Sequence, residues 1–159
     1  MSAQLTDNEL LITRTFDAPA ELVFSMWSDP EHFKHWMGPE TFDCPVVNMD
    51  FRVGGTYRAM IRSDKHGENW FGGVYKEIEP CTRLVFTFVW DSGGPSDGVE
   101  TVITILFREI GGKTEQIFHQ TGILNAESRD SQLGGWSSAI NKEAAYITNI
   151  LEKQQRSKP

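Results

Sequence analysis

The chain has 159 residues, a formal net charge of −7 and a hydrophobic fraction of 39%. Because binding to nucleic-acid phosphates depends on clustered Lys and Arg, this acidity argues against a nucleic-acid partner. The sequence contains no apolar run of membrane-spanning length and no export signal, so we expect no membrane association and a cytoplasmic location. The length fits one domain over residues 1–159, with frayed ends at about 1–8 and 154–159.

The N-terminal part of the chain predicts one strand followed by two short helices. The strand is expected over Glu9–Phe16, and the first helix runs from Pro19, at its first position, to about Ser28. Asp29-Pro30 then combines an N-cap with a proline at the first helical position, and Gly38-Pro39 ends the second helix.

From Phe42 onward the apolar residues recur with period 2, which predicts a series of strands. The expected strands are Cys44–Met49, Thr56–Arg62, Trp70–Ile78, Leu84–Trp90, Thr101–Arg108 and Lys113–Thr121. Gly72-Gly73 indicates either a bulge or the close approach of another backbone. A loop is expected over 91–98 and a hairpin turn at Gly111-Gly112. Connections this short make the sheet antiparallel.

The C-terminal stretch from about Ser128 to Lys153 predicts one long helix. Its apolar stripe consists of Leu133, Trp136, Ile140, Ala144, Ile147 and Leu151. The polar residues between them, Lys142 and Glu143 included, are assigned to a solvated back. Gly134-Gly135 is unusual there, since each glycine costs a helix about 1 kcal/mol relative to alanine.

Together these elements predict an α+β fold in which a curved antiparallel sheet of about six to seven strands wraps around the long helix. A straight helix across a curved sheet tends to leave space between the two. That space is the natural place for a ligand.

Several stretches carry a resemblance to a known family. They are FDAPAELVFSMWSDPEHFKHWMGP, FRVGGTYR, GGVYKEIEPCTRLVFTFVW, TVITILF, KTEQIFHQTGI and the GW of Gly135-Trp136. From about Leu11 to Leu151 the chain resembles the START-like helix-grip (SRPBCC) superfamily, which includes pollen allergens. It is most similar to the branch named after the activator of the heat-shock-protein ATPase. Fold alone does not settle the chemistry.

The resemblance implies a cavity for a small apolar or aromatic molecule between sheet and C-terminal helix. The residues expected to contact it are Trp36, Tyr57, Phe86, Phe88, Trp90, Ile103, Ile105, Phe118, Gln120, Trp136 and Ile140. Gln116, Phe118 and Gln120 are placed inward, although a register shifted by one would turn Ile117 and His119 inward instead. Gly134-Gly135, opposite Trp36 and Met37, would either mark the cavity mouth or allow the helix to pack closely on the sheet.

Two other functions remain open. One is a cyclase- or hydrolase-like reaction in the same cavity, which needs a buried acid or base such as Glu77, Tyr57 or His119. The other is a stress-response or chaperone-partner role, which needs an exposed docking patch. The sequence contains no positive sign of a catalytic centre, and we expect no cofactor and either a monomer or a homodimer.

His32 and His35 lie three residues apart, but no metal-ligand motif accompanies them, so we expect surface histidines and no metal site. Cys44 and Cys81 are too few for a disulfide framework, and each is expected to be a free, buried thiol.

Overall fold

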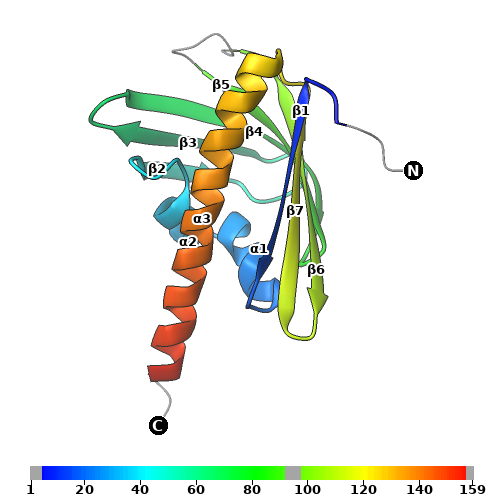
Figure 1. Cartoon of the computed structure of the whole chain (residues 1–159), viewed down its shortest axis with the longest axis vertical. Coiled ribbons are helices and arrows are strands. Elements are labelled where there is room, and N and C mark those ends of the chain that lie inside the picture. Colours follow the sequence, from blue (N-terminus) through cyan, green and yellow to red (C-terminus); the bar gives the residue numbers. More distant parts are fainter. Residues whose placement is uncertain (1–4, 92–97, 157–159) are drawn as a thin grey trace.

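The computed structural model describes residues 5–91 and 98–156. In this part of the chain three helices accompany a seven-stranded antiparallel sheet, which confirms the α+β helix-grip prediction (Figure 1). The elements are β1 (Glu9–Phe16), α1 (Ala20–Ser28), α2 (Pro30–Trp36), β2 (Asp43–Met49), β3 (Thr56–Ser63), β4 (Gly67–Glu79), β5 (Arg83–Trp90), β6 (Thr101–Ile110), β7 (Lys113–Thr121) and α3 (Ala126–Arg156).

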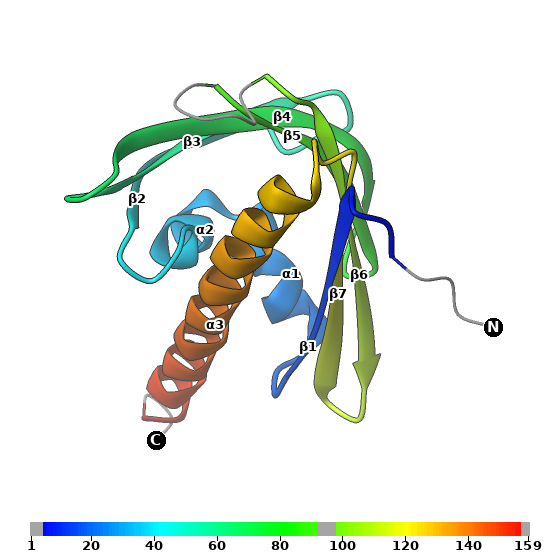
Figure 2. The same cartoon turned by 45° about the horizontal axis from the view of Figure 1, so that its top comes forward.

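The strand order in the sheet is β1-β7-β6-β5-β4-β3-β2. Neighbours from β2 to β7 are consecutive in sequence, whereas β1 pairs with β7, so that Glu9 lies opposite Thr121. The sheet curves around α3, and α1 and α2 lie on the same concave side (Figure 2). The backbone of α3 lies close to β1, α1 and α2, while large side chains fill the distance to the middle strands.

The observed ends of the elements differ slightly from the predicted ones. Pro19 is the N-cap of α1 rather than its first residue, whereas Asp29 caps α2 as predicted, its carboxylate accepting from the Glu31 amide at 2.9 Å. β4 begins at Gly67, three residues before the predicted start, because the polar residues there still pair with β3. Most of the predicted loop, residues 92–97, lies outside the described residues.

Gly72 and Gly73 are required by close backbone packing. A Cβ at Gly73 would lie 2.0 Å from the carbonyl oxygen of Thr87, and one at Gly72 would lie 2.5 Å from that of Tyr57. The irregularity in the β4–β5 pairing lies farther along, between Tyr75 and Glu77. Of the two predicted explanations for this glycine pair, close approach is therefore the correct one.

α3 packs against the interior with the predicted stripe, which the structure extends on one side to include Ala139 and Glu143. Its N-cap is Asn125, whose Oδ1 accepts from the Ser128 amide at 2.8 Å. Its buried residues are Ser128, Trp136, Ala139, Ile140, Glu143 and Ile147. Leu133, Ala144 and Leu151 are half-buried and border this set. The assignment of Glu143 to the solvated back is wrong.

Candidate functional site

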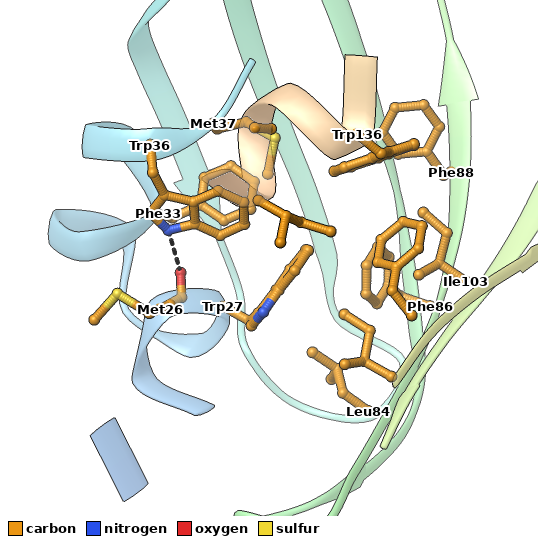
Figure 3. Packing of buried hydrophobic residues seen from close by; sticks show 14 of the residues in the cluster. Met26, Trp27, Phe33, Trp36, Met37, Leu84, Phe86, Phe88, Ile103 and Trp136 are labelled. Atoms are coloured by element: carbon orange, nitrogen blue, oxygen red, sulfur yellow. Dashed lines mark hydrogen bonds between the residues drawn. The ribbon is translucent and has the colours of Figure 1, made fainter. Parts of the chain in front are cut away.

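The side chains between α3 and the concave face of the sheet form a connected aromatic interior. Trp136 of α3 lies 4.7 Å from Phe118 of β7 and 5.5 Å from Phe88 of β5, measured between ring centroids. Trp27 of α1 lies 6.3 Å from Trp136 and joins this group from the opposite side (Figure 3). Such ring contacts stabilise by about 0.5–1.5 kcal/mol each beyond the area they bury.

Two glutamine side chains of β7 enter this interior, and each accepts a hydrogen bond from an indole. The Trp27 Nε1–H donates to Gln116 Oε1 at 3.0 Å, and the Trp136 Nε1–H donates to Gln120 Oε1 at 3.1 Å. Gln116 and Gln120 are 1% and 0% exposed. Because burial of an unpaired amide is costly, these bonds orient both indoles and both amides.

Gln120 has a partner for each of its amide protons. Its Nε2 donates to Thr101 Oγ1 at 2.9 Å and to Gln132 Oε1 at 3.0 Å. The Thr101 hydroxyl in turn donates to the Phe88 carbonyl oxygen at 2.8 Å. At this end of the interior the buried polar groups therefore satisfy one another.

Gln116 differs from Gln120, because the amide group of Gln116 donates to a carboxyl group. Its Nε2 donates to Glu143 Oε1 at 3.0 Å, and Glu143 is 0% exposed. In the described part of the chain, the other oxygen, Oε2, makes no hydrogen bond. Burial raises the pKa of Glu143 to about 8, while the Gln116 hydrogen bond, the nearby indole N–H of Trp27 and the charge of Arg14 act in the opposite direction.

Glu143 was missed at the sequence level because a charged residue on a helix is normally read as solvent-facing. Its spacing nevertheless reveals it, since Trp136, Ile140, Glu143 and Ile147 follow one another at intervals of four, three and four residues. Glu143 therefore lies on the apolar stripe itself. A carboxyl group in phase with that stripe is the signal that could have identified it.

The structure brings the predicted ligand-contacting residues together in this interior. All of them except Trp90 are buried, and Trp90 is half-buried against Phe71 and Phe88. Gln116, Phe118 and Gln120 face inward as expected, while Ile117 and His119 lie on the outer face of β7. Their contact with a ligand stays a prediction.

Trp36 and Tyr57 are both buried, and each donates a hydrogen bond to a backbone carbonyl oxygen. Trp36 is fully buried between the two short helices, and its Nε1–H donates to the Met26 carbonyl oxygen at 3.2 Å (Figure 3). The Tyr57 hydroxyl donates to the Thr87 carbonyl oxygen at 2.6 Å. Both side chains are therefore part of the buried interior and not of its border with solvent.

The three predicted acid–base candidates do not form a catalytic group. Glu77 is exposed and pairs with Arg83, and His119 pairs with Glu9 at 2.9 Å on the outer face of the sheet. Tyr57 is buried, and its burial raises the pKa well above the usual value, so it stays protonated at neutral pH. The buried carboxyl that such chemistry would use is Glu143.

His32 and His35 both contact Tyr146 of α3. His32 Nδ1 lies 2.7 Å from the Tyr146 hydroxyl, and the His35 ring stacks on the Tyr146 ring at 4.9 Å. Among the residues that the structure describes, no three His, Cys, Asp or Glu side chains are grouped so as to hold a metal ion. The two histidines thus attach α2 to α3.

Cys44 and Cys81 are both free thiols, but only Cys44 is buried. Burial raises the pKa of Cys44 to about 11, so its thiol is protonated at neutral pH. Cys81 is half-buried in the turn between β4 and β5, contrary to the prediction of a buried side chain.

The connection between α2 and β2 is attached to α3 by polar contacts. Lys142 Nζ donates to the carbonyl oxygens of Gly38, Pro39 and Phe42 at 3.0, 3.2 and 3.0 Å. The Ser138 hydroxyl accepts from the Glu40 amide at 2.7 Å. Any opening of the interior between α3 and this connection would have to break these bonds.

Gly134-Gly135 lies beside the same connection. A Cβ at Gly134 would meet nothing within 4 Å, and one at Gly135 would lie 3.6 Å from Pro39 Cγ. Close helix-to-sheet packing therefore does not account for this glycine pair. A role at an entrance stays a prediction.

Comparison with known families identifies the chain. A family model described as "Activator of Hsp90 ATPase homolog 1-like protein" (AHSA1) matches residues 17–148. The chain belongs to this family. The match spans most of the chain and confirms the START-like resemblance read from the sequence motifs.

Solved structures from other organisms share the fold. A protein from Chromobacterium violaceum is 29% identical, with a TM-score of 0.77 over 87% of this chain and 96% of that one. The AHSA1 protein from Silicibacter pomeroyi is 22% identical, with a TM-score of 0.80 over 89% and 99%. A protein of unknown function from Staphylococcus aureus is 20% identical, with a TM-score of 0.74 over 91% and 95%. The last two show the shared fold alone.

No curated protein matches the chain. None of the helices in residues 5–91 and 98–156 is both long enough and apolar enough to span a bilayer. Membership of the AHSA1 family therefore establishes the fold, and the function has to be argued from the interior itself.

Proposed function

We propose that this protein binds a small apolar or aromatic molecule between α3 and the concave face of the sheet. The ligand would lie among the rings of Phe88, Phe118 and Trp136, which provide a large apolar contact area. Ligand sites of this kind are mostly apolar, with a few polar groups that orient the ligand. A non-catalytic binding protein is the function that fits best.

The observation that carries this proposal is the set of three buried polar side chains, Gln116, Gln120 and Glu143. A core that only has to fold is more stable without them, since polar groups lose hydration when they are buried. Here they extend from β7 and α3 into an interior otherwise formed by aromatic and aliphatic side chains. Convergent polar groups in an apolar interior are typical of a binding site.

The direct test is native mass spectrometry of the protein purified from its host. The expected result is an additional mass of a small organic molecule that dissociates on unfolding. Gln120→Met should weaken its retention, because the substitution keeps the volume and removes the hydrogen bonds to Trp136 and Thr101. Gln154→Met, on the exposed end of α3, is the matched control and should retain the molecule. Equal retention by both variants would place the molecule elsewhere.

A second candidate function is acid–base catalysis of a cyclase- or hydrolase-like reaction in the same interior. The observation that favours it is the fully buried carboxyl group of Glu143, because burial raises its pKa to about 8 and such a group is suited to proton transfer. A bound molecule whose mass changes over time in the wild type but not in Glu143→Gln would support catalysis. Because a cyclisation can conserve mass, the chromatographic retention of the molecule is compared as well, and unchanged mass and retention leave binding as the function.

Two further expectations remain part of the proposal. The free thiols of Cys44 and Cys81 favour a reducing, cytoplasmic location.

A chaperone-partner role has less support, because the exposed large apolar residues of the described chain are spread over β1, β6 and segments outside the helices and strands. They are Leu5, Leu11, Val53, Val102, Ile110 and Leu124.

A further inference from the structure

The second carboxyl oxygen of Glu143 is the exception in an otherwise satisfied interior. Both indole N–H groups are bonded to glutamines, and Gln120 has a partner for each amide proton. In native structures most buried polar atoms have a partner, so one without a partner calls for a reason. Glu143 Oε2 has none among the described protein groups, although the residue is fully buried.

The surroundings of this carboxyl group favour its neutral form. Trp27 of α1 and Gln116 of β7 are uncharged, and the charged side chain that acts on Glu143 is Arg14 of β1. The Arg14 guanidinium is bonded to Asn141 Oδ1 at 2.5 Å rather than to Glu143. A buried carboxylate without a cationic partner is costly, so the group keeps its proton instead.

The hydrogen bond from Gln116 decides which oxygen carries that proton. Because Gln116 Nε2 donates to Oε1, Oε1 is the acceptor, and the proton of the neutral acid lies on Oε2. Oε2–H is then a buried donor that no described protein group accepts. A ligand that completes this site would supply an acceptor.

We propose that neutral Glu143 donates a hydrogen bond from Oε2 to an uncharged acceptor, such as a carbonyl oxygen, on an otherwise apolar or aromatic ligand. This inference rests on the proposed binding function and narrows its ligand class to ketones, esters and similar neutral carbonyl compounds. A cationic amine would require the ionised form of Glu143 and is disfavoured.

Three probes of similar size separate these possibilities: acetophenone, which has a carbonyl acceptor, ethylbenzene, which has none, and benzylamine, which is cationic. Their affinities are measured by titration calorimetry at pH 6 and pH 9. At pH 6 acetophenone should bind the wild type at least about 10-fold more tightly than ethylbenzene, as a satisfied buried hydrogen bond requires. At pH 9, above the pKa of about 8, most of this preference should be lost.

Variants at the same position test the role of the proton. Glu143→Gln keeps a donor and should retain the acetophenone preference at both pH values. Glu143→Met removes the donor and should bind both probes equally. Glu152→Gln, an exposed change on the same helix, should behave as the wild type does.

Two results would overturn the inference while leaving the proposed binding function intact. They are equal affinities of the wild type for acetophenone and ethylbenzene, and a preference for benzylamine that strengthens as the pH rises. If none of the three probes binds and no molecule co-purifies with the protein, both the inference and the proposed function are wrong.

Discussion

Glu143 makes the stability of the ligand-free protein depend on pH in an unusual direction. Its pKa is about 8 in the folded protein, compared with an ordinary value of 4.5. Between these values the folded state holds a proton that the unfolded state has released. The free energy of unfolding should therefore fall as the pH rises from about 4.5 to about 8, by at most about 1.4 kcal/mol per pH unit from this group.

Urea denaturation of the wild type and Glu143→Gln across this pH range measures the effect. The variant cannot ionise, so its stability relative to the wild type should increase steadily up to about pH 8 and then level off. Glu152→Gln should follow the wild-type profile, because Glu152 is exposed. Parallel profiles for the wild type and Glu143→Gln would contradict the buried, neutral state of this carboxyl group.

At the scale of elements, Lys142 and Ser138 are the side chains that join α3 to the connection after α2, and Lys142 makes most of the bonds. It donates to three carbonyl oxygens, and burial lowers its pKa without an acidic partner in hydrogen-bonding contact. Lys142→Met keeps the length of the side chain but removes these bonds. It should reduce the free energy of unfolding by about 2 kcal/mol.

Urea denaturation measures this loss of stability. An unchanged m-value would show that the folded and unfolded states of the variant are as compact as those of the wild type. Lys113→Met is the matched control, because Lys113 is exposed at the start of β7, and its midpoint should hardly move. If Lys142→Met has the midpoint of the wild type, the polar contacts do not hold the connection in place.

Gly134 and Gly135 lie within α3, where alanine would be a better helix former. Since an added Cβ meets nothing closer than Pro39 Cγ at 3.6 Å, each alanine variant should gain about 0.5–1 kcal/mol of stability. If the pair lets α3 bend to admit a ligand, the same variants should take up acetophenone more slowly in stopped-flow tryptophan fluorescence. Greater stability with unchanged uptake would argue against an entrance here.

The elements could be predicted closely because their patterns are local. In β6 the buried Ile103, Ile105 and Phe107 alternate with more exposed residues, so the strand and its inner face follow from three neighbouring positions. The polar part of the site is different. Trp27 and Gln116 are 89 positions apart, and nothing near either residue indicates the bond between them. Glu143 was assigned to the solvated back of the helix because of its charge, although its spacing places it on the apolar stripe.

At the scale of the whole molecule, the first strand and the last helix lie side by side and together enclose the interior. β1 pairs with β7 through its full length, and Arg14 of β1 bonds to Asn141 of α3. The sequence order of hairpins predicts the neighbours from β2 to β7, whereas the position of β1 depends on pairing between distant segments. The interior is thus enclosed only after both ends of the chain have been placed.

This arrangement determines which segments should exchange their amide hydrogens more slowly when a ligand is bound. The backbone of α3 lies against β1, α1 and α2, so a molecule in the interior has to be accommodated by small movements of α3 and of residues 38–42. In hydrogen-exchange mass spectrometry, acetophenone should slow exchange in α3 around Trp136–Ile147 and in residues 38–42. The exposed end of α3, residues 152–156, should exchange at the same rate with and without it.

The ligand should also raise the overall stability by mass action, by about 2.7 kcal/mol at 100 times its dissociation constant. Gln120→Met should reduce both effects together, because it weakens binding without opening the sheet. Protection confined to the outer face of the sheet would instead indicate surface binding. Since α3 and β7 supply the polar groups from opposite sides, a ligand between them should protect both elements at once.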